Sequence, residues 1–177
     1  MKKLVLFADL DGTLIETLSG RIPKGIWDMR FKFDVLDKIK ELGLEHIIIV
    51  TNQGGIEKGF VEELDFVHKI RYVQFALKEY CGKPHVWYQY CPYNDKKHPD
   101  RKPNTGMLEK AFKIINSDSR FTDSSIVPFE KKDCIMLGDA SGKQGQFSDS
   151  DKKTAENFGI DYIDVNDFIS ETFKIEE

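Results

Sequence analysis

The chain has 177 residues, which suits one domain with a substantial core, and we expect a single domain over residues 1–177. Hydrophobic residues make up 40% and charged residues 32%, a mixture that excludes the fibrous and disordered classes. The formal net charge of −4 argues against strong non-specific binding to nucleic acid, but it is compatible with a local basic rim.

The apolar runs at 4–8 and 47–50 are far too short to cross a bilayer, so no membrane partner is expected. Asp9 and Asp11 follow the first run directly, without a small-residue cleavage site, which favours a buried strand over a signal peptide. The three cysteines are odd in number and lack framework spacing, which indicates reduced thiols. We therefore expect a cytoplasmic protein.

Short apolar runs alternate with amphipathic segments, the pattern of an α/β protein with a central, mostly parallel sheet and helices on both faces. Strands are expected at 4–8, 46–50, 86–90, 134–137 and, at an edge, 162–163. Helices are expected at 35–42, 61–80, 108–115, 151–158 and 167–173. Residues 91–103 form a polar loop, and 117–132 form an exposed connection to which no role is assigned.

Polar residues stand at the carboxyl ends of three central strands. They are Asp9, Thr51 and Asp139. Ligands of open α/β sheets bind outside these ends, so three separate segments aim polar groups at one edge of the sheet.

Asp9 and Asp11 are two residues apart at a strand end, and Gly12 permits the turn that lets both face one cavity. One carboxylate can attack phosphorus while the other handles the proton on the leaving oxygen. Asp-Gly is also a common turn dipeptide, but its position after an apolar strand, with Thr-Leu following, favours the catalytic interpretation.

Three further segments add to this pair. The Thr51 hydroxyl and the backbone around Asn52 can hold phosphate oxygens, although both residue types are also ordinary caps. Lys102, before a helix, can neutralise charge on a transferring phosphoryl group. Asp139, with Asp9, can supply oxygen ligands to Mg²⁺.

In this order, the four segments resemble the haloacid dehalogenase (HAD) superfamily of phosphohydrolases, with its Rossmann-like fold. The resemblance implies that Asp9 is the nucleophile and Asp11 the general acid/base, and that Thr51 and Lys102 bind phosphate. It also implies a Mg²⁺ site formed by Asp9, Asp139 and the backbone carbonyl of Asp11. Because Asp11 is present, a phosphatase is favoured over a dehalogenase.

Only about 20 residues separate the first motif from the next helix, too few for a cap domain, so we expect an open, capless site. The chain carries five local motifs: Asp-Gly-Thr-Leu-Ile at 11–15, Thr-Asn-Gln at 51–53, Arg-Lys-Pro at 101–103, Gly-Asp-Ala-Ser-Gly-Lys at 138–143 and Phe-Ser-X-X-Asp at 147–151. They are similar to those of the 3′-phosphatase domain of polynucleotide kinase/phosphatase.

This resemblance implies removal of 3′-phosphates from DNA ends, as in DNA repair, with Lys58 as a basic residue near the nucleic-acid strand. Asp151 either lies behind the metal site through a lysine or water, or simply caps its helix. Trp27 can stack on a terminal base, although a core or flap-packing role is favoured. No P-loop motif occurs in the sequence, so no 5′-kinase activity is expected, and no required protein partner is evident.

The alternative is a small-molecule phosphatase of the histidinol-phosphate or heptose-bisphosphate type. Such relatives share the Arg-Lys-Pro block and often bind zinc in the preceding loop. Of the usual ligands only Cys91 persists, and His98 and Asp100 stand where a cysteine pair would be. Together with His85 they could supply the four ligands of a tetrahedral site, but a metal-free loop is favoured. A non-catalytic binding module is disfavoured, since Asp9 and Asp11 are both present.

Overall fold

The computed structural model describes residues 5–20, 22–117 and 128–170. Its centre is a five-stranded parallel sheet in the order β5-β4-β1-β6-β7. The strands are β1 (Val5–Ala8), β4 (His46–Asn52), β5 (His85–Cys91), β6 (Cys134–Gly138) and β7 (Asp161–Asp164). Each expected strand is present, most of them one or two residues longer than the sequence indicated; residue 4 of the first lies outside the described residues.

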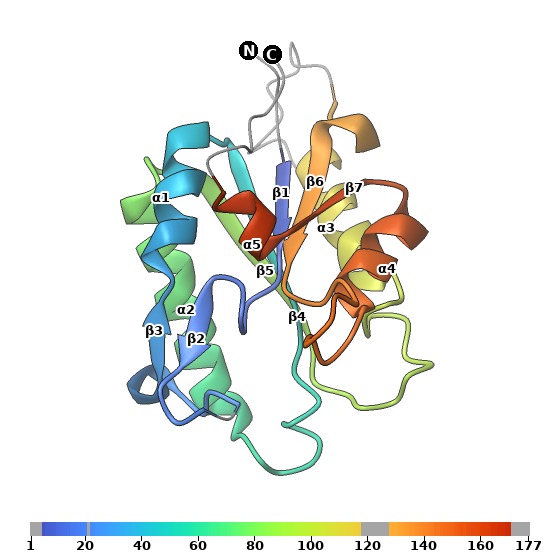
Figure 1. Cartoon of the computed structure of the whole chain (residues 1–177). Coiled ribbons are helices and arrows are strands. Elements are labelled where there is room, and N and C mark those ends of the chain that lie inside the picture. The colour runs from blue at the N-terminus through green and yellow to red at the C-terminus, as the bar shows by residue number, and fades with distance from the viewer. Residues whose placement is uncertain (1–4, 21, 118–127, 171–177) are drawn as a thin grey trace.

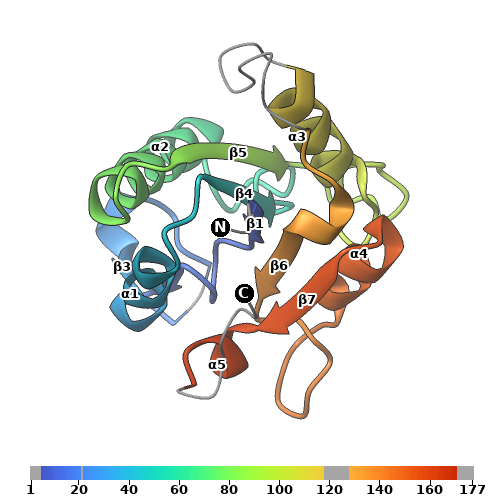
Figure 2. The same cartoon turned by 90° about the horizontal axis from the view of Figure 1, so that it is seen from above.

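Helices cover both faces of the sheet (Figure 2). The helices α1 (Phe33–Leu42), α2 (Glu63–Tyr80) and α5 (Val165–Phe168) pack on one face, and α3 (Gly106–Ser117) and α4 (Ser150–Phe158) pack on the other. Side chains of β1 alternate between the two layers: Leu6 enters one and Phe7 the other. Because both layers are apolar, β1 is buried throughout, and β4 and β6 are buried at all but one residue each. The Rossmann-like α/β prediction is confirmed.

A small antiparallel hairpin, β2 (Ile15–Thr17) and β3 (Met29–Phe31), stands beside the main sheet. Its connection includes the short 3-10 helix η1 (Ile26–Asp28). The Asp28 carboxylate accepts hydrogen bonds from the Ser19 amide and hydroxyl, both at 2.9 Å. In the described residues, the hairpin is all that lies between the first motif and α1, so the capless prediction is confirmed.

Helix boundaries differ from the predictions where local caps intervene. The second helix begins at Glu63 instead of residue 61. The last begins at Val165 and ends at Phe168, which corrects the predicted 167–173. The Asp164 side chain accepts a hydrogen bond from the Asn166 amide, which starts the helix earlier than its apolar pattern suggests. Residues 171–173 lie outside the described residues.

The connection predicted at 117–132 is described only in part, because 118–127 lie outside the described residues. Its described end, 128–132, is exposed as predicted, with one exception. Phe129 is buried and exchanges two hydrogen bonds with the Asn116 side chain. The 3-10 helix η2 (Lys131–Asp133) then leads into β6.

Cys81, Cys91 and Cys134 are free and buried, which confirms the prediction of reduced thiols. Within the described ranges, no helix is both long and apolar enough to cross a membrane.

Candidate active site

The site lies at the carboxyl edge of the sheet, where the loops after β1, β4 and β6 gather (Figure 1, lower end of the view). Asp9 directly follows β1, the central strand, and its amide donates to the Leu137 carbonyl at 2.9 Å. This bond continues the pairing of β1 with β6 by one residue. The carboxylate of Asp9 is thereby fixed between the ends of β4 and β6.

Three carboxylates meet at this edge: Asp9, Asp139 and Asp151 each offer an oxygen within 4.8 Å of the others. The Lys102 ammonium lies among them, 2.5 Å from Asp9 Oδ1 and 2.7 Å from Asp151 Oδ1. Asp9, Lys102 and Asp151 are buried. With all four groups ionised, the cluster carries a net charge of −2, which favours binding of a divalent cation.

The pKa shifts within the cluster also favour binding of a cation. Burial raises the pKa of Asp9 well above its usual value, against the opposing effect of Lys102. Burial, and then the charge of Asp151, raise the pKa of Asp139 to about 6. Burial lowers the pKa of Lys102, but Asp151 and Asp9 outweigh it and raise the pKa overall, so the lysine stays charged.

Asp139 itself shows that the residues fit a metal ion. Its Oδ1 atom is buried and has no hydrogen-bond partner within the described part of the chain. Gly12, at φ +89°, makes room for it, because a Cβ atom there would lie 2.1 Å from Asp139 Oδ2. Carboxylate oxygens with a net negative charge are the donor set that Mg²⁺ prefers.

The Asp11 carboxylate is held apart from this cluster by two donors. Gln53 Nε2 donates to Asp11 Oδ2 at 2.7 Å, and Lys69 Nζ lies 3.2 Å from Asp11 Oδ1. The Gln53 amide also reaches the Thr51 hydroxyl at 2.9 Å. Asp11 thus presents its side chain beside the cluster, where a proton donor would stand, while only its backbone remains available for the metal role implied earlier.

The three remaining residues predicted to bind phosphate have different surroundings. Thr51 is buried at the end of β4, beside the cluster. Asn52 uses both ends of its amide on the Lys102 backbone, accepting from the Lys102 amide at 2.9 Å and donating to its carbonyl at 3.0 Å. Lys58 is exposed in the loop after β4, and the described residues give its side chain no hydrogen bond or ion pair.

For Asp151, the structure favours one of the two roles left open. Its Oδ2 accepts from the Ala140 amide at 3.2 Å while Oδ1 pairs with Lys102, and the residue at the N-cap of α4 is Asp149. Asp151 therefore supports the site through Lys102. Trp27 is not a core residue, since it is 67% exposed; its ring packs over Gly25, within the hairpin connection.

The sequence analysis gave no role to three residues of the site. They are Gln53, quoted only as part of the motif at 51–53, Lys69, and Lys32, whose Nζ donates to the Gly12 carbonyl at 3.0 Å. The sequence does contain a signal for Lys69. It stands three residues after Phe66 and four before Val73, on the apolar stripe of α2, where a lysine is out of pattern.

In the loop considered for zinc, Cys91 Sγ lies 3.7 Å from His98 Nδ1, and the Asp100 carboxylate pairs with Lys110 at 2.6 Å. The described residues hold one group of three potential metal ligands, the carboxylates around Lys102.

Comparisons with known proteins identify the family of the chain. Residues 3–169 match the family model described as polynucleotide kinase 3 phosphatase. A bifunctional polynucleotide phosphatase/kinase of Schizosaccharomyces pombe is 36% identical over 165 residues, which cover 91% of this chain and 36% of that protein. The chain therefore spans about a third of that relative's length.

A D-glycero-beta-D-manno-heptose-1,7-bisphosphate 7-phosphatase of Haemophilus ducreyi is 31% identical over 127 residues, covering 67% of this chain and 69% of the relative. Among solved structures, the D,D-heptose 1.7-bisphosphate phosphatase of B. bronchiseptica, complexed with magnesium and phosphate, superposes with a TM-score of 0.64. At 20% identity, over 90% of this chain and 78% of that one, this likeness shows a shared fold.

Proposed function

The chain belongs to the polynucleotide kinase 3 phosphatase family, and from this premise we propose that it is a Mg²⁺-dependent phosphatase that removes the 3′-phosphate from polynucleotide ends. The observation that carries the proposal is the pairing of Asp9 with Lys102 inside a ring of carboxylates at the carboxyl edge of the sheet. A nucleophile, a phosphate-binding cation and a metal-binding carboxylate, Asp139, thereby share one site.

In the proposed reaction, an Asp9 carboxylate oxygen attacks phosphorus, and the bond between phosphorus and the ester oxygen breaks. The electron pair stays on the leaving oxygen, which takes a proton from Asp11 and departs as the alcohol. Water then attacks the aspartyl phosphate and gives a proton to Asp11. The bond from phosphorus to Asp9 breaks, which restores the carboxylate and releases inorganic phosphate.

The other side chains supply charge and shape for these steps. Lys102 offsets negative charge on the transferring phosphoryl group, and the Thr51 hydroxyl offers a hydrogen bond to one of its oxygens. Asp9, Asp139 and the backbone carbonyl of Asp11 would hold Mg²⁺. That ion would reduce the repulsion between the attacking carboxylate and the phosphate dianion.

A polynucleotide is proposed as the substrate because of the family match and the open site. Without a cap in the described residues, a large substrate can approach the carboxyl edge of the sheet. Exposed Lys58, in the loop after β4, is available to contact a phosphate of the strand. We further propose DNA as the polynucleotide and end repair as the setting; a cytoplasmic location stays a prediction.

The alternative substrate is a phosphorylated sugar, which the Haemophilus ducreyi relative favours. The two are separated by comparing kcat/KM in Mg²⁺ on a 3′-phosphorylated DNA oligonucleotide, heptose 1,7-bisphosphate and histidinol phosphate. The oligonucleotide is expected to be preferred by roughly 100-fold, equivalent to about 2.7 kcal/mol of transition-state binding. A preference for either small molecule would reject the polynucleotide assignment while leaving the phosphatase chemistry intact.

A further inference from the structure

Lys69 is a fully buried cation within reach of the site, although it belongs to α2, which supplies none of the predicted catalytic residues. An ammonium group is costly to bury unless charges and carbonyl oxygens replace its water. The groups that contact the Lys69 ammonium therefore indicate its role.

Lys69 Nζ has three partners. It lies 3.2 Å from Asp11 Oδ1 and 3.0 Å from the carbonyl oxygen of Pro23, and it stands 5.4 Å from the centre of the Phe66 ring. Pro23 belongs to the buried part of the hairpin connection. One lysine thus joins the acid/base carboxylate, the hairpin and the face of α2.

Asp11 needs such a restraint because its side chain is 27% exposed, and an unrestrained carboxylate there can turn towards water. With Lys69 on Oδ1 and Gln53 on Oδ2, both of its oxygens are held by side chains from different elements. Neither donor lies in the ring of carboxylates around Lys102, so the two parts of the site are held separately.

We propose that Lys69 is a positioning residue, which orients Asp11 for proton transfer and ties that orientation to the hairpin at Pro23. This role rests on the proposed function. Lys69 neither gives nor takes a proton in the reaction. It fixes the place from which Asp11 protonates the leaving oxygen when the ester bond breaks.

If Lys69 positions Asp11, the loss of kcat/KM in a Lys69 variant should depend on the leaving group of the substrate. A 3′-phosphorylated oligonucleotide releases an alkoxide that needs a proton, whereas 4-nitrophenyl phosphate releases a stable phenolate that does not. Lys69→Met is expected to lower kcat/KM on the oligonucleotide by roughly 100-fold, the scale of general-acid catalysis, and on the aryl ester by less than about threefold. Because kcat/KM reports phosphoryl transfer to Asp9, later hydrolysis does not mask the difference.

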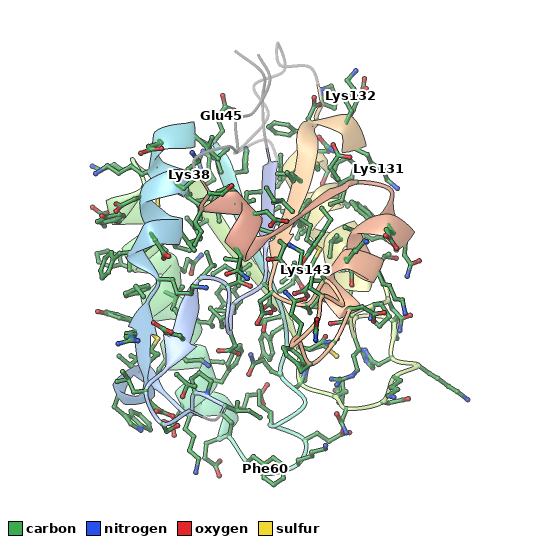
Figure 3. The ribbon with its side chains drawn as sticks, in the orientation of Figure 1. Lys38, Glu45, Phe60, Lys131, Lys132 and Lys143 are labelled. Carbon is green, nitrogen blue, oxygen red and sulfur yellow. The ribbon has the colours of Figure 1, made fainter. Side chains whose placement is uncertain are left out.

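Lys131→Met is the matched control. Lys131 also donates to a carbonyl oxygen, that of Phe158, and stands 4.3 Å from the centre of an aromatic ring, but it contacts no carboxylate of the site. Figure 3 places it at the end of the molecule opposite Phe60, which lies on the loop after β4. This variant is expected to leave both substrates unaffected.

Lys69→Gln is the second variant, because it keeps a donor for the Pro23 carbonyl and is easier to accommodate if Lys69→Met does not fold. It is expected to show the same selective loss on the oligonucleotide. Equal losses on both substrates, or no loss on either, in folded protein would overturn the positioning role. An inactive wild-type protein would instead reject the proposed function itself.

Discussion

The Asp139 carboxylate is set up to be neutralised by a cation. Its buried Oδ1 has no partner in the described chain, and burial raises its pKa to about 6 from a usual value of 3.8. The folded, metal-free protein therefore favours the protonated acid more than the unfolded chain does. Its stability is expected to fall as pH rises from about 4 to about 6, and to stay lower above that range.

Asp139→Asn is accordingly expected to stabilise the metal-free protein. At pH 7.5 in EDTA, the free energy of unfolding should rise by about 1 kcal/mol, because an ionised buried carboxylate is replaced by a neutral amide. The gain should vanish near pH 4, where the wild-type acid is protonated. Urea unfolding at the two pH values measures both effects.

The same variant tests the metal site. Mg²⁺ is expected to raise the melting temperature of the wild-type protein, since a ligand that binds only the folded state stabilises it. It should leave that of Asp139→Asn unchanged. An equal response of both proteins to Mg²⁺ would show that Asp139 is not a ligand.

At the scale of elements, the site depends on how the loop that carries Lys102 is attached to β4. Asn52, the last residue of β4, binds the Lys102 backbone through both ends of its amide. This contact joins residues 50 apart in sequence. It fixes the backbone of Lys102, from which the side chain extends to Asp9. We therefore propose that Asn52 affects phosphate binding by positioning Lys102.

Asn52→Ala should lower kcat/KM by at least about tenfold, because the displaced ammonium no longer meets the phosphoryl group in the right geometry. It should also cost about 1–2 kcal/mol of unfolding free energy for the two lost hydrogen bonds. Steady-state kinetics and thermal melts of the purified variant give the two quantities.

Asn104→Ala is the control for this effect. Its side-chain amide donates to the carbonyls of Lys96 and His98 inside the same loop, at 3.0 and 2.8 Å, and not to the Lys102 backbone. It should lose similar stability but keep most activity. If both variants lost activity equally, activity would depend on the order of the whole loop and not on the contact between Asn52 and the Lys102 backbone.

The main strands were predictable because each is an apolar run bounded by polar residues, and burial on both faces leaves no other place for such a run. The hairpin strands were not predicted: Ile15–Thr17 and Met29–Phe31 are three residues long and mix apolar with charged side chains. These two short strands form because they pair with each other, and no local sequence pattern marks either of them. Similarly, the start of α5 depends on the cap at Asp164 and not on periodicity.

Across the whole molecule, the proximity of Asp9 and Asp139 was predictable because topology alone brings the ends of parallel strands together. Asp9 and Asp139 follow neighbouring strands, and Lys102, which lies in a recognisable motif, contacts Asp9 across 93 residues. Lys69 and Gln53 contact Asp11 across 58 and 42 residues, through the packing of α2 and the loop after β4. No local pattern specifies those contacts, although the lysine on an apolar helix face indicated one.

The most direct test is the rate of phosphate release from a 3′-phosphorylated DNA oligonucleotide, measured for the wild-type protein and for Asp9→Asn with circular dichroism to verify the fold. We expect release by the wild-type protein that requires Mg²⁺ and stops in EDTA. The variant should be slower by at least about 10⁴-fold, because its amide cannot attack phosphorus. Comparable release by the two proteins, or none by the wild-type protein in Mg²⁺, would contradict the account.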